Sequence, residues 1–151
     1  DVTVVGVDVA QDAIAWARAH HAGANVEFRV GDGLAFEDAA GFDAIVSLET
    51  VEHVEDPGRL VAKLASLLRP KGVLIASVPT TPSVDLNPHH RHDFSEGSFR
   101  RLVAECAPGL RERDALRQVQ SVSPLRVLAR SEKLGVEPDA EFLEKLRAAL
   151  H

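Results

Sequence analysis

The sequence contains one cysteine, no methionine and no long hydrophobic run, and these shortages exclude several classes of protein. With Cys106 alone the chain cannot build an internal disulfide framework, which fits a reducing compartment, so we expect a cytoplasmic protein. No apolar stretch approaches the roughly 20 residues of a membrane-spanning helix, and no signal peptide opens the sequence. We therefore expect no membrane span.

Positive charge is also in the minority, because the sequence has 17 Lys and Arg residues but 23 Asp and Glu residues, which gives a net charge of -6. Sequence-independent binding to nucleic acid needs a basic face, so we expect no nucleic-acid partner. The length of 151 residues suits one globular domain. Since methionine is absent and Asp1 directly precedes an apolar run, we expect a fragment of a longer protein.

Residues 4–9 form a short apolar run, rich in β-branched side chains, that includes Asp8 near its end. Such a run is typical of a strand buried on both faces of a parallel sheet. An acidic residue at the carboxyl end of this strand can bind both hydroxyls of a ribose, or it can cap the helix that follows. The run alone favours neither role.

Strand and helix patterns alternate along the chain, which predicts an α/β fold with a parallel sheet covered by helices on both faces. Trp16 and Cys106 are expected in its core. The predicted elements are a helix over 11–21, strands over 26–30 and 42–48, a helix that Asp56 caps and residues 69–72 end, a strand over 73–78, a helix that Ser95 caps, two strands between 110 and about 130, and a helix over 139–150.

Polar or loop-forming residues follow four of these strands. Parallel strands joined by right-handed connections have their carboxyl ends at one edge of the sheet. We therefore expect Asp8, Asp32, Glu49 and Pro79 to meet at one binding crevice.

Several segments, in order, resemble the class I S-adenosylmethionine-dependent methyltransferases, especially the O-methyltransferases of quinone biosynthesis and of bacterial sugars or lipids. The set covers residues 1 to about 130 at family-like spacing and is more specific than any single segment. It consists of Gly6-Val7-Asp8-Val9-Ala10, Arg29-Val30-Gly31-Asp32-Gly33, residues 42–47 with Glu49, Glu52-His53-Val54, Asp56-Pro57 and residues 68–74.

The resemblance implies a Rossmann-like, doubly wound, mostly parallel sheet with an antiparallel last strand. Residues 1–130 would form a partial methyltransferase domain and 131–151 a C-terminal helical extension. The family's first strand, its glycine-rich loop and its first helix have no counterpart in the sequence. Because that strand is central in the family's sheet, we expect a gap with exposed apolar faces and weak cofactor binding by this chain alone.

The resemblance also implies S-adenosylmethionine as the cofactor and a small-molecule substrate, with an oxygen atom as the acceptor. Asp8 would bind the ribose and Asp32 the adenine amino group. The other implied cofactor contacts are Val9, Gly33, Leu34 and Leu48.

Methyl transfer is an in-line displacement, so alignment of donor and acceptor is the main task, and a base assists a hydroxyl acceptor. His53 is the first candidate base; alternatively, its ring bonds to backbone and fixes a loop. Glu49 would orient the acceptor or the cofactor's amino group, unless it is merely solvated. His89 lies in the long loop after Pro79, which the resemblance places over the substrate.

His89, His90, His92 and Asp93 form a cluster in that loop, but neighbouring histidines in an extended segment point apart, so we expect no metal site. Two other functions stay open: an NAD(P)-binding Rossmann oxidoreductase, and a non-catalytic degenerate module of the methyltransferase type. Neither the identity of the acceptor nor assembly into a homo-oligomer is decided by the sequence.

Overall fold

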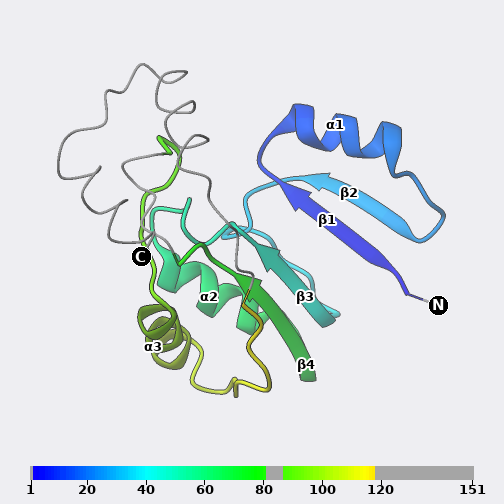
Figure 1. The fold of residues 1–151 in the computed structure, drawn as a ribbon. Helices are drawn as coiled ribbons and strands as arrows, with labels where there is room; N and C mark the ends of the chain where they lie inside the picture. The colour runs from blue at the N-terminus through cyan, green and yellow to red at the C-terminus, as the bar shows by residue number, and fades with distance from the viewer. Residues whose placement is uncertain (1, 81–86, 118–151) are drawn as a thin grey trace. The chain divides into compact units, whose positions relative to one another are not determined.

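A computed structural model describes residues 2–80 and 87–117 of the chain, which divides into two compact units, residues 1–111 and 112–151. Within the described residues, all helices and strands belong to the first unit. In chain order they are β1 (Val4–Asp8), α1 (Gln11–His20), β2 (Val26–Val30), β3 (Phe42–Leu48), α2 (Pro57–Ser66), β4 (Leu68–Ser77) and α3 (Glu96–Cys106) (Figure 1).

Strand β1 pairs in parallel with β2, and α1 lies along one side of this pair (Figure 1). The register runs from Val4 opposite Val26 to Asp8 opposite Val30, so the two strands end side by side. The buried side chain of α1 is that of Ile14. This arrangement brings the turns after β1 and β2 to one edge.

Strands β3 and β4 form a second parallel pair, and α2 lies between this pair and α3 (Figure 1). The register shifts between Phe42 and Ala44, and β4 bulges at this point. A Cβ atom on Gly72 would lie 2.9 Å from the carbonyl oxygen of Arg69 and 3.0 Å from that of Phe42. The bulge therefore needs glycine at this position because backbone approaches from two sides.

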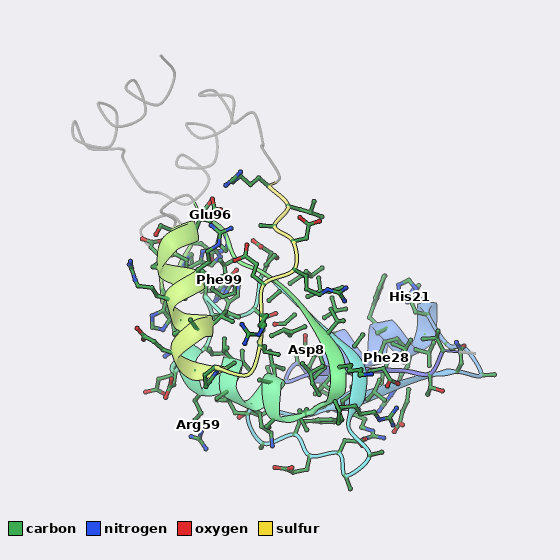
Figure 2. All side chains as sticks on the ribbon, turned by 90° about the horizontal axis from the view of Figure 1, so that it is seen from below. Asp8, His21, Phe28, Arg59, Glu96 and Phe99 are labelled. Carbon is green, nitrogen blue, oxygen red and sulfur yellow. The ribbon has the colours of Figure 1, made fainter. Side chains whose placement is uncertain are left out.

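The main hydrophobic core lies around α2 and α3. The carboxylate of Asp56 accepts a hydrogen bond from the Arg59 N–H at 2.9 Å, and a capping box with Ser95 begins α3. Arg59 itself projects from the exposed side of α2, whereas Phe99 of α3 packs on the core (Figure 2). The buried residues of this core are Val51, Leu60, Val61 and Ala107.

The predicted α/β class with parallel strands is confirmed, and Cys106 packs on the core as predicted. The expected core position of Trp16 is wrong, because its side chain is 57% exposed and its ring stacks on His20. Residue 16 is two positions after the buried Ile14, about 200° further around a helix of 3.6 residues per turn. It therefore falls on the opposite side of α1.

The predicted turn over residues 69–72 is a bulge inside β4, so this strand begins earlier than expected. Of the two strands predicted between 110 and about 130, only residues 110–117 are described, and these contain no strand. The predicted helix over 139–150 and the predicted boundary at 130 lie outside the described residues. In the described part, no helix combines the length and apolar character needed to cross a bilayer.

Among the described residues, β1–β2 and β3–β4 form two separate sheets. One face of the second sheet exposes Val46, Leu48 and Ile75, which are 61%, 56% and 51% accessible. Strands of parallel sheets usually have both faces covered. The separation and the exposed side chains agree with the predicted gap in the sheet.

We expect Asp56→Ala to lower the free energy of unfolding by about 1 kcal/mol, because the first turn of α2 loses the acceptor for the Arg59 N–H. Asp56→Asn keeps a cap and should stay close to the parent chain. Urea denaturation followed by circular dichroism measures both. Equal losses in the two variants would contradict the capping role.

Candidate functional site

The two predicted cofactor carboxylates stand at neighbouring strand ends. Asp8 ends β1, and its Oδ1 accepts a hydrogen bond from the Ala10 N–H at 2.7 Å. Asp32 follows β2, and its Oδ1 accepts from the Leu34 N–H at 2.9 Å. The Gly31 N–H donates to the Asp8 carbonyl oxygen at 2.9 Å, which ties the two turns together.

The alternative role of Asp8 as a helix cap is only partly realised. The N-cap residue of α1 is Ala10, which makes no side-chain cap, and Asp8 stabilises the turn before it. Both Asp8 and Asp32 are exposed. Figure 2 shows Asp8 and His21 at opposite ends of α1. The carboxylate of Asp8 thus stands on the strand-end side, as predicted from the sequence.

A hollow of about 240 Å³ lies beside Asp8, between α1 and the first sheet. Ligand pockets usually measure about 300–1,000 Å³, so this hollow alone is small for a nucleoside. Asp32 does not contribute to it. Its walls are Gly6, Val7, Asp8, Ala13, Ile14, Ala17 and Phe28.

The remaining predicted cofactor contacts differ in their surroundings. Val9, directly after β1, and Leu48, the last residue of β3, are exposed apolar residues with 70% and 56% of their surface accessible. Leu34 instead packs on the core around α2. Gly33 is close to α2 as well, since a Cβ atom there would lie 3.6 Å from Leu60. The two exposed residues are the ones available for apolar contact with a ligand.

Glu49 immediately follows β3 and has a φ of 51°, which is uncommon for a residue with a side chain. The hydroxyl of Ser77 donates to Oε1 of Glu49 at 2.7 Å, and the Glu49 N–H donates to the Ser77 carbonyl oxygen at 3.1 Å. These bonds to the end of β4 hold the strained backbone in place. Such strained positions concentrate at functional sites.

The backbone of Glu52 anchors the loop that carries His89. Its carbonyl oxygen accepts hydrogen bonds from the N–H groups of Arg91 at 2.9 Å and His92 at 3.2 Å. Nδ1 of His53 bonds to the carbonyl oxygen of His89 at 2.8 Å. The ring of His53 thus makes the backbone contact that the sequence predicted as its alternative role. His89 takes part in this contact through its carbonyl oxygen, not through its side chain.

Glu52 is fully buried, and neither of its carboxylate oxygens has a hydrogen-bond partner. Its Oε1 lies 3.7 Å from Nε2 of His53, and the rings of His53 and His90 meet edge to face at 4.7 Å between centroids. The loop histidines do not gather by themselves, because Nε2 of His92 bonds instead to the Val54 carbonyl oxygen.

Glu52 was not among the functional residues predicted from the sequence. The signal that was available is its position between Val51 and Val54, in a segment apolar enough to be buried. A buried carboxylate in such a place needs a partner. The segment from Glu49 to His53 therefore carries both an exposed and a buried acidic residue.

Comparisons with known proteins point in one direction. Residues 2–76 match the family model described as a methyltransferase domain. A ubiquinone biosynthesis O-methyltransferase of Xanthomonas axonopodis pv. citri is 40% identical over 49% of this chain and 33% of its own length. One of Pseudomonas syringae pv. tomato is 28% identical over 97% of this chain and 70% of its own. The Xanthomonas match thus spans a third of that relative.

The fold also resembles solved structures. The N-methyltransferase NodS of Bradyrhizobium japonicum, solved in complex with S-adenosyl-L-homocysteine, superposes with a TM-score of 0.56 at 20% identity. The match covers 68% of this chain and 53% of NodS. At this level of sequence identity, the similarity shows a shared fold and not a shared function.

We expect His53 and His92 to adopt opposite neutral tautomers. Because a carbonyl oxygen only accepts, His53 must carry its hydrogen on Nδ1, whereas His92 must carry it on Nε2. Imidazole ¹⁵N chemical shifts at alkaline pH report both. His92 is the internal control, and an Nε2–H tautomer at His53 would contradict the loop geometry.

Proposed function

This chain belongs to the class I S-adenosylmethionine-dependent methyltransferases, and on that premise we propose that it transfers a methyl group from S-adenosylmethionine to an oxygen atom of a small molecule. Family membership implies the cofactor. The observation that carries the proposal is the placement of Asp8 and Asp32 after two adjacent parallel strands, linked by the Gly31 N–H. Oxygen as acceptor is supported by the O-methyltransferase relatives.

On the cofactor side, Asp8 would accept hydrogen bonds from the ribose hydroxyls while keeping its contact with the Ala10 N–H. Asp32 would accept from the adenine amino group, with the backbone of Gly33 and Leu34 nearby. The exposed apolar side chains of Val9 and Leu48 would contact the cofactor from two strand ends. These contacts would fix the donor for in-line transfer.

On the acceptor side, His53 is the proposed base. Its Nδ1 donates to the His89 carbonyl oxygen, so in the neutral ring Nε2 keeps the lone pair that accepts a proton. Glu49 would orient the acceptor or the amino group of the cofactor, because Ser77 holds its carboxylate in one place. The exposed side chain of His89 would contact the substrate.

Equilibrium titration with S-adenosylhomocysteine tests the ribose contact. We expect Asp8→Ala to weaken binding ten- to a hundredfold, since hydrogen bonds to a charged group contribute about 1.5–3 kcal/mol. Asp8→Asn preserves an acceptor for the Ala10 N–H, and its loss should be smaller. The control Asp12→Ala changes an exposed acid in the first turn of α1. Unchanged affinity in Asp8→Ala would remove the ribose assignment.

The acceptor atom can be identified with labelled S-adenosylmethionine and a panel of phenols, catechols and primary amines. We expect label on oxygen, because the curated relatives are O-methyltransferases. Label on nitrogen would contradict the oxygen acceptor. Cofactor binding without transfer to any member of a broad panel would favour the non-catalytic alternative.

A further inference from the structure

We propose that Glu52, His53 and His90 bind one divalent first-row transition-metal ion, with zinc as the reference case. The three residues each offer a ligand atom, and these atoms all lie within 4.8 Å of one another. The site goes beyond the proposed methyl transfer, and its existence does not depend on that reaction. It also differs from the sequence-based expectation, which considered only His89, His90, His92 and Asp93 of the loop and expected no metal site there.

The burial of Glu52 supports a bound metal ion. Its carboxylate is inaccessible to solvent, and both oxygens lack a hydrogen-bond partner. An ionised carboxylate is strongly destabilised in such a place unless a positive charge or donors compensate it. Nε2 of His53, at 3.7 Å from Oε1, is beyond hydrogen-bonding distance. A cation between these atoms would satisfy both.

The orientation of His53 also favours a bound metal ion. Its Nδ1 must donate to the His89 carbonyl oxygen, so in the neutral ring the Nε2 lone pair is directed to the Glu52 side. Two acceptors then face each other. Histidines that bind metals commonly donate their other ring nitrogen to a backbone carbonyl, which fixes the tautomer and the ring orientation. The His53–His89 contact is of this kind.

Backbone contacts already hold together the two segments that carry these ligands, the one with Glu52 and His53 and the loop with His90. The N–H groups of Arg91 and His92 both donate to the Glu52 carbonyl oxygen. His90 lies directly before this anchor, and its N–H donates to the Asn87 carbonyl oxygen at 2.9 Å. The His90 ring therefore meets the His53 ring without any rearrangement of the backbone.

The spacing and the donor set indicate the type of ion. Ligand atoms on a tetrahedral zinc ion lie about 3.4 Å apart, since each bond is about 2.1 Å. The 3.7 Å between Glu52 and His53 is close to this value, and a small side-chain movement would bring the third ligand in. One carboxylate with two imidazoles suits zinc, cobalt or manganese, whereas Mg²⁺ and Ca²⁺ prefer oxygen ligands throughout.

Three protein ligands would leave a coordination position open, as in catalytic zinc sites. An ion bound at Nε2 of His53 would occupy the lone pair that the proposed base uses, so His53 would act as a base only while the ion is absent.

Metal binding by the full chain, stripped with a chelator, can be measured by calorimetric titration with Zn²⁺ and by visible absorption with Co²⁺. We expect one ion per chain, with Mg²⁺ unable to compete at a hundredfold excess. Glu52→Gln should weaken Zn²⁺ binding at least tenfold, because it removes the only charge of the ligand set. His90→Gln should do the same from the loop side.

The matched controls are Glu55→Gln, an exposed carboxylate of the same segment, and His21→Gln, an exposed imidazole beyond α1. Both should bind within twofold of the parent chain. Circular dichroism establishes folding, and His90→Gln stays informative if the buried Glu52→Gln does not fold. The proposal is overturned if the parent chain binds no ion, or if folded His90→Gln binds like the controls. None of these measurements requires methyl transfer, so a failed metal site would leave the proposed function untouched.

Discussion

The geometry of the site depends on one backbone contact: the carbonyl oxygen of Glu52 accepts the N–H groups of both Arg91 and His92. This contact joins the segment after β3 to the loop after β4, although a helix and a strand separate them in the sequence. It satisfies polar groups of two irregular segments at once. Without it, His53 would lose the His89 carbonyl oxygen as a partner, and its ring orientation would not be defined.

The acidic residues near the strand ends divide into two kinds according to their surroundings. Asp8 and Asp32 are exposed and accept hydrogen bonds from turn N–H groups, so their charge is compatible with solvent and with a hydroxylated ligand. Glu52 is buried, has no donor for its side chain and faces an imidazole. We therefore propose ribose as the ligand of the exposed carboxylate of Asp8 and a cation as the ligand of the buried one, because burial changes the cost of a carboxylate charge.

Local signals in the sequence were sufficient to predict where two of the described helices begin. Asp56-Pro57 and Ser95 predicted the starts of α2 and α3, because capping bonds involve residues three apart. The turn over 69–72 was misjudged, since Pro70 and Gly72 are typical of a loop, whereas the pairing of Phe42 with Leu68 makes the segment part of β4. The predicted core position of Trp16 was wrong because its position on the helix turns its side chain to solvent.

The sequence by itself predicted the α/β class, because that depends on apolar periodicity. It also carried the ordered short motifs through which the chain resembles the methyltransferase family, and that resemblance implied the cofactor. Tertiary structure alone decided that Glu52 is buried and that His90, but not His92, lies beside His53. These facts depend on contacts between segments that are remote in the chain. The direction of a loop side chain depends on the long-range hydrogen bonds of the loop backbone, and residue spacing in the sequence does not specify those bonds.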